Sequence, residues 1–203
     1  MTVPGRIVVA DGVQGLIFDC DGTLADSMPV HMEGWRQAFA DAGVDVPVPW
    51  LDSLRGTPEV QVVVLANEQF GLALDPVATV VAKHRVYRQM LDDVRPIEPV
   101  VAVVHAHRGR LPMAVASGGT RENVALVLDR LGLSDAFVAV LTADDEIEHK
   151  PSPQIFLEAA RLMGVAPERC QVFEDGDMGL DAARRAGMIA TDVRPYIDQE
   201  QPR

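Results

Sequence analysis

Short apolar runs alternate with helical patterns along most of this 203-residue chain, and polar residues follow each run. The apolar runs predict strands at residues 13–19, 112–116, 137–141, 170–173 and 188–193, with a short edge strand at 7–10. Helical patterns cover residues 98–108, 121–132, 153–163 and 177–186. This alternation predicts an α/β fold with a doubly wound parallel sheet. In such sheets functional side chains gather at the carboxyl ends of the strands.

The segment between the first two main strands is helical and far too long for a simple crossover. About 65 residues separate these strands, whereas a crossover needs little more than one helix. We expect helices at residues 27–42, from Pro58 to a stop at Gly71 with Thr57 as N-cap, and at 76–91. We therefore predict a small helical domain, residues 26–94, inserted into a core domain formed by residues 1–25 and 95–203.

Two carboxylates, Asp19 and Asp21, follow the first apolar strand. In an extended chain residues i and i+2 point to the same side, so both side chains project beyond the strand while Cys20 faces away. Like charges this close raise one pKa unless a cation lies between them. The pair therefore indicates either a shared proton or a divalent metal. Gly22 permits a sharp turn, and Thr23 offers a hydroxyl beside the carboxylates.

Three further polar motifs follow later strands. Ser117–Thr120 opens a helix, where glycines and exposed amides suit a phosphate group. Lys150 stands before Pro151, Ser152 and Pro153, which fix it near a strand end, and its neighbour His149 is given no role. Glu174 and Asp175 follow the fourth main strand. Carboxylate oxygens are ligands that suit magnesium.

Together these motifs resemble the haloacid dehalogenase superfamily, in the order motif I (residues 19–23), II (117–118), III (150) and IV (174–175). The resemblance implies a Rossmann-like core with a helical cap, and it is greatest to the β-phosphoglucomutase-like branch. The run from Val172 to Met188 looks most like the fructose-1-phosphate phosphatase-like members. The implied substrate is a small-molecule phosphate ester, and the implied cofactor is Mg²⁺.

The resemblance also implies roles for the motif residues. Asp19 would attack phosphorus and form an aspartyl phosphate, and Asp21 would act as general acid and base. Lys150 and the loop at Ser117 and Gly118 would hold the phosphoryl group. Mg²⁺ would be held by Asp19, the Asp21 backbone carbonyl, Asp175 and, in support, Glu174. In the helical domain, His31 and Arg55 are candidate substrate-binding residues.

Two other functions fit parts of this pattern. A sugar-phosphate mutase of the same branch would also use these motifs. The mutases usually carry an arginine shortly after the cap glycine, where Pro58, Glu59 and Val60 stand here. This difference favours hydrolysis, although another basic residue of the insertion could substitute for that arginine: Arg55, Lys83, Arg85 or Arg88. A receiver-like phospho-binding module has a similar acidic pocket, but receivers have no long helical insertion after the first strand.

Charge and composition restrict the kinds of binding partner and the location that we expect for this protein. The formal net charge of -12 and the pI near 4.7 argue against nucleic acid, which requires a basic face. We expect no membrane association, because no apolar run reaches the ~18 residues of a membrane span. The start of the chain does not resemble a signal peptide, and two cysteines give no disulfide pattern. We therefore predict a cytoplasmic protein, expected to be a monomer.

Overall fold

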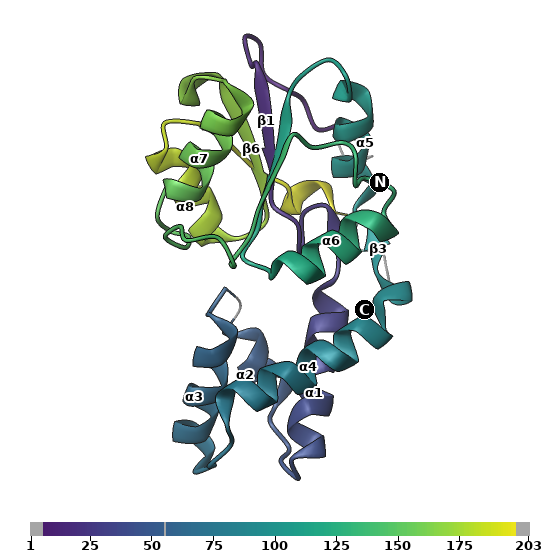
Figure 1. Ribbon diagram of the computed structural model, residues 1–203, viewed down its shortest axis with the longest axis vertical. Coiled ribbons are helices and arrows are strands. Elements are labelled where there is room, and N and C mark those ends of the chain that lie inside the picture. The colour runs from purple at the N-terminus through teal and green to yellow at the C-terminus, as the bar shows by residue number, and fades with distance from the viewer. Residues whose placement is uncertain (1–5, 55, 198–203) are drawn as a thin grey trace. The chain divides into compact units, whose positions relative to one another are not determined.

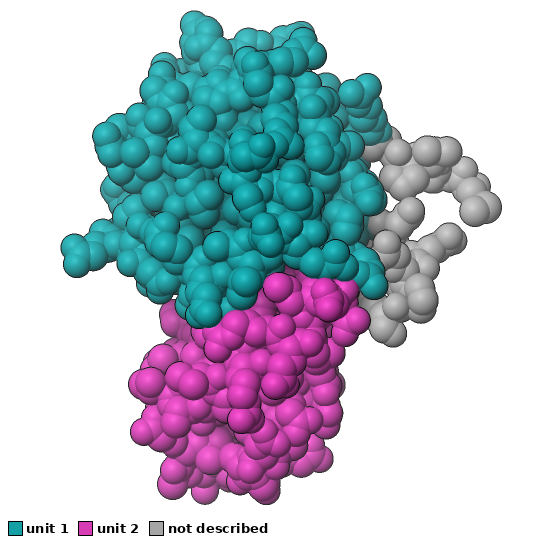
Figure 2. Space-filling model, turned by 45° about the vertical axis from the view of Figure 1, so that its right-hand side comes forward, with its two compact units in different colours: residues 1–26, 95–203 teal, residues 27–94 magenta. Residues whose placement is uncertain are grey.

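The computed structural model describes residues 6–54 and 56–197. The chain forms two compact units, drawn in two colours in Figure 2: unit 1 comprises residues 1–26 and 95–203, and unit 2 residues 27–94. The α/β fold predicted from the sequence is confirmed, because unit 1 contains a five-stranded parallel sheet with the strand order β5-β4-β1-β6-β7. Its strands are β1 (Gly15–Phe18), β4 (Met113–Ala116), β5 (Ala139–Leu141), β6 (Cys170–Glu174) and β7 (Ile189–Asp192).

Helices cover both faces of this sheet (Figure 1). They are α5 (Glu98–His107), α6 (Arg121–Arg130), α7 (Gln154–Met163) and α8 (Asp177–Arg185), with α7 and α8 on the side opposite α5 and α6. Short 3₁₀ turns lie at Leu91–Asp93, Pro167–Arg169 and Arg194–Tyr196. A strand covered on both faces must be apolar throughout, which explains why Leu16, Ile17 and Phe18 are all fully buried.

The strand at the centre of the sheet anchors the site. Phe18 of β1 stacks on Phe173 of β6 with ring centroids 4.8 Å apart, and the two residues pair in parallel register. Parallel register places the residues that follow, Asp19 and Glu174, at the same edge of the sheet. The fold thus brings together motifs more than 150 positions apart in the sequence.

The predicted edge strand at residues 7–10 is wrong. In the described part of that segment the backbone bonds to the side chain of Gln171 instead of to a neighbouring strand. Ala10 N donates to Gln171 Oε1 (2.8 Å), and Gln171 Nε2 donates to the Val8 carbonyl (3.1 Å). One buried amide thus takes the place of a strand ladder.

Both connections between the units run through a short antiparallel ribbon. It pairs β2 (Ala25–Asp26) with β3 (Arg95–Pro96). The sequence pattern indicates no strand at either of these two short segments. The ribbon ties the outgoing and returning chains together at the border of unit 1.

Unit 2 consists of helices α1 (Met28–Asp41), α2 (Val48–Asp52), α3 (Glu59–Phe70) and α4 (Pro76–Gln89). Its core includes Trp35, Phe39, Leu51 and Val63. Helix α2 is not expected from the sequence, because prolines at 47 and 49 commonly break a helix, yet proline is tolerated in a first helical turn. Pro58, not Thr57, is the N-cap of α3. No helix in the described residues is long and apolar enough to cross a membrane.

Candidate active site

Three carboxylates meet at the carboxyl ends of β1 and β6. Asp19, Glu174 and Asp175 each offer an oxygen, and these oxygens lie within 4.8 Å of one another. Asp19 and Glu174 are buried, with 7% and 3% of their surface exposed. Oxygen ligands alone, with positions left for water or substrate, are the environment that Mg²⁺ prefers in proteins. The residues present therefore fit a hard divalent cation.

The ammonium group of Lys150 lies inside this cluster. Its Nζ donates to Asp19 Oδ1 (2.7 Å) and to Glu174 Oε1 (2.5 Å) and lies 5.2 Å from the centre of the Phe156 ring. Burial alone would lower the pKa of Lys150, but the two carboxylates outweigh it and raise that pKa above its usual range. Lys150 is therefore a permanent cation between two acidic residues.

The carboxylates have perturbed pKa values of their own. Burial, together with Glu174 and Asp175, raises the pKa of Asp19 well above its usual value, although Lys150 opposes this. Burial and Glu174 raise the pKa of Asp175 to about 6. Burial is the largest cause of both shifts, and the neighbouring carboxylates add to it.

The turn that follows Asp19 brings further groups to the cluster. Gly22 has φ of +83°, and an added Cβ would lie only 2.7 Å from Cγ of Asp175, so this position requires glycine for both backbone and space. Thr23, which is fully buried, donates its hydroxyl to Asp175 Oδ1 (3.1 Å). Thr23 thus helps to hold Asp175. The sequence predicted only that the Thr23 hydroxyl lies near the carboxylates and did not identify this partner.

The loop at residues 117–120 lies beside Asp21. An added Cβ on Gly119 would lie 3.2 Å from Asp21 Oδ2 and 3.3 Å from Ser117 Oγ. Ser117 is buried and its Oγ accepts a hydrogen bond from Gly119 N (3.0 Å), whereas Gly118 is exposed. The loop thus offers an accessible backbone beside the second aspartate.

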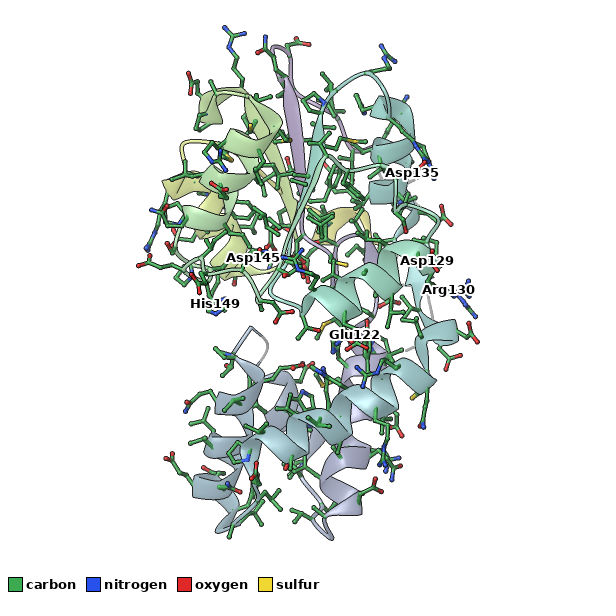
Figure 3. All side chains as sticks on the ribbon, viewed as in Figure 1. Glu122, Asp129, Arg130, Asp135, Asp145 and His149 are labelled. Atoms are coloured by element: carbon green, nitrogen blue, oxygen red, sulfur yellow. The ribbon has the colours of Figure 1, made fainter. Side chains whose placement is uncertain are left out.

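A salt bridge that sequence reasoning missed joins this loop to the one that carries Lys150. Arg121, the first residue of α6, pairs with Asp145 (2.6 Å), which also accepts from the Thr142 amide (2.8 Å). Asp145 and His149 both lie at the edge of unit 1 where the strands end (Figure 3). Nothing in the sequence pattern pairs Arg121 with Asp145, because they are 24 positions apart on separate loops.

The predicted substrate-binding residues of the helical insertion belong to unit 2. His31 lies in α1 of unit 2, where its Nδ1 is 2.7 Å from Lys83 Nζ. Arg55 lies outside the described residues. The roles assigned to individual residues from the sequence stay predictions, although the structure does bring Asp19, Lys150 and Glu174 together.

The family follows from comparison with known proteins. A family model described as haloacid dehalogenase-like hydrolase matches residues 13–187. This chain belongs to that family. The match spans both units and all four motifs, and the resemblance seen in the sequence is confirmed.

Individual relatives agree with this assignment. Fructose-1-phosphate phosphatase YqaB of Escherichia coli (strain K12) is 42% identical over 181 residues, covering 89% of this chain and 96% of that protein. The crystal structure of CbbY from Rhodobacter sphaeroides, in complex with phosphate, matches with a TM-score of 0.77 at 25% identity, covering 93% and 90% of the two chains. β-Phosphoglucomutase from Clostridium difficile matches with a TM-score of 0.75 at 24% identity, covering 89% and 84%; this last likeness shows the fold alone. The predicted enzyme class, a phosphoric monoester hydrolase, is confirmed.

Proposed function

We propose that this haloacid dehalogenase-like hydrolase is a magnesium-dependent phosphatase that cleaves a small sugar phosphate through an aspartyl phosphate on Asp19. The observation that carries the proposal is the Lys150 ammonium held between Asp19 and Glu174, with Asp175 in the same cluster. The phosphatase relative supports the substrate class. The cytoplasmic location and monomeric state also stay predictions.

Charge balance supports a divalent cation. Three ionised carboxylates and one ammonium leave two negative charges in a buried cluster, which one Mg²⁺ would balance. Asp19, Glu174, Asp175 and the Asp21 carbonyl would hold it. When bound, the ion would neutralise phosphoryl oxygens and lower the raised pKa values of Asp19 and Asp175.

The chain's own residues account for the remaining steps. Asp19 Oδ attacks phosphorus while the bond to the sugar oxygen breaks, and Asp21 gives that oxygen its proton. Lys150 and the amides near Ser117 stabilise the transferring group. Asp21 then takes a proton from water as water releases phosphate and restores Asp19. We retain His31 and Arg55 as candidates for sugar binding.

One contact in unit 2 favours hydrolysis over the mutase reaction. Glu59 stands near the place where the mutases usually carry an arginine for a second phosphate. Its carboxylate pairs with Lys83 and, at 2.5 Å, with His84 Nε2. A negative charge that already engages the neighbouring cation is poorly suited to a bisphosphate intermediate.

The test is phosphate release from a panel of sugar phosphates that includes fructose 1-phosphate, with Mg²⁺ and with excess EDTA. We expect multiple turnovers with Mg²⁺, none with EDTA, and none in Asp19→Asn, whose folding is checked by circular dichroism. Conversion of β-glucose 1-phosphate to glucose 6-phosphate without phosphate release would instead establish a mutase. Formation of one stable phosphoenzyme without turnover would indicate a receiver-like module.

A second experiment tests the separate roles of Asp19 as nucleophile and Asp21 as general acid and base. Asp21→Asn removes general acid–base help worth ~10²–10⁴-fold per step. Acetyl phosphate has a leaving group that needs no proton, so it should still phosphorylate Asp19 in this variant, and the phosphoenzyme should accumulate. Rapid-quench mass spectrometry detects the added mass. If acetyl phosphate and a sugar phosphate are slowed equally with no phosphoenzyme, Asp21 is not the acid–base residue.

A further inference from the structure

We infer that Gly179 is a positioning residue for the candidate active site. The absence of a side chain at this position, the third residue of α8, leaves the space that the Glu174 carboxylate fills. The inference deepens the proposed function and rests on it, because it explains how Glu174 is held against Lys150.

Glu174 is fixed on three sides. Its Oε1 accepts from Lys150 Nζ at 2.5 Å, and its Oε2 accepts from the backbone amide of Gly176 at 2.9 Å. The third side is the first turn of α8, at Gly179. An added Cβ there would overlap Oε1 and the carboxyl carbon of Glu174, and even the farther oxygen, Oε2, would lie only 2.7 Å away.

Space is the requirement at Gly179, and backbone conformation is not. Gly179 is a buried helical residue with no positive φ, unlike Gly22, whose φ is +83°. Alanine therefore suits the backbone here and is the better helix former. Gly179 weakens its helix, and its backbone conformation does not require glycine. The Glu174 carboxylate that lies against it explains why glycine is present.

A Cβ at position 179 must therefore displace the Glu174 carboxylate. Glu174 is the flexible partner in this contact, and it is 3% exposed, so its carboxylate cannot swing into solvent without leaving Lys150 or the Gly176 amide. Lys150 would then keep Asp19 as its remaining carboxylate partner among those described. The fold should survive this change, whereas the geometry of the cluster should not.

The experiment is a double-mutant cycle of Gly179→Ala and Glu174→Ala, read by kcat, by the Mg²⁺ concentration for half-maximal activity, and by thermal unfolding without metal. In the wild-type background we expect Gly179→Ala to lower kcat at least about tenfold. In the Glu174→Ala background the Cβ meets no carboxylate, so we expect a further change below about twofold. The unfolding midpoint should rise by about 2–4 °C only in that second background.

A matched control distinguishes an effect specific to position 179 from a general effect of alanine in the first turn of α8. Met178→Ala alters the adjacent, exposed residue of α8 and should leave kcat within about twofold of wild type. An equal loss from Gly179→Ala in both backgrounds, or no loss in either, would overturn the inference. Wild-type protein without phosphatase activity would refute the proposed function, and the unfolding midpoints would then still decide whether Gly179 accommodates Glu174.

Discussion

Each unit of this hydrolase places one lysine against aromatic rings, and the two lysines differ in the number of carboxylates around them. In unit 1, Lys150 bridges Asp19 and Glu174 beside a third carboxylate and lies 5.2 Å from the centre of the Phe156 ring. In unit 2, Lys83 is fully buried, pairs with Glu59 and His31, and lies 5.5 Å and 5.4 Å from the rings of Trp35 and Tyr87.

The difference lies in the charge that each lysine leaves uncompensated. Around Lys150, burial first and the neighbouring carboxylates second raise the pKa values of Asp19 and Asp175, which is consistent with the proposed site for a cation and a phosphoryl group. Glu59 shows the reverse, because hydrogen bonds from His84 and Lys83 overcome its burial and lower its pKa to about 2. A lysine beside more carboxylates than it can neutralise indicates chemistry, whereas one matched by a single carboxylate indicates a structural role.

Lys150→Met should have the largest effect. It removes the positive charge between Asp19 and Glu174, and we expect kcat to fall at least about 100-fold, or ~2.7 kcal/mol of transition-state stabilisation. Steady-state phosphate release measures this loss, and circular dichroism checks the fold. Activity within tenfold of wild type would indicate that Lys150, like Lys83, has a structural role.

Glu59→Gln should mainly affect stability. It leaves the Lys83 ammonium buried without a countercharge, which costs about 3–5 kcal/mol for a fully buried pair. Because the Glu59 side chain is 32% exposed, we expect the free energy of unfolding to fall by about 2 kcal/mol. Urea unfolding at pH 7 measures this change.

The same variant gives a pH test with a definite sign. The folded-state pKa of Glu59 is lowered to about 2 from an ordinary 4.5, so its stabilising contribution is complete above 4.5 and is lost as pH falls towards 2. The stability difference between wild type and Glu59→Gln should therefore shrink below pH 4.5. A difference that is constant between pH 7 and pH 3 would show that charge is not the cause.

Asp175→Ala should raise the Mg²⁺ concentration needed for half-maximal activity by about tenfold, ~1.4 kcal/mol. It removes one of three carboxylates and leaves the Thr23 hydroxyl without its partner at 3.1 Å. A Mg²⁺ titration of phosphate release measures the shift. An unchanged requirement would exclude Asp175 from the cation site.

Lys83→Met should have the smallest effect on stability, below about 1 kcal/mol. Methionine fills a similar volume between Trp35 and Tyr87, and Glu59, which is partly exposed, keeps its contact with His84. Urea unfolding beside Glu59→Gln makes the comparison. A loss larger than that of Glu59→Gln would mean that the lysine, more than its countercharge, stabilises unit 2.

Local patterns in the sequence determined the α/β class and the position of acidic residues at the carboxyl edge of the sheet. Apolar runs such as 15–18 and 170–173 report burial on both faces, and parallel strands bring the residues that follow them to one edge. These local patterns alone therefore predict that Asp19, Lys150 and Glu174 lie at strand ends. They do not predict helix α2, because its prolines suit a first turn as well as a break.

Only the tertiary structure decided which distant groups touch. The Gln171 side chain, not a strand ladder, holds residues 8–10, and Glu59, on α3, reaches Lys83 on α4. The need for glycine at position 179 is visible only against the Glu174 carboxylate. Sequence periodicity reports what a residue does within its own element, whereas ion pairs and steric limits depend on how separate elements pack, which no local pattern encodes.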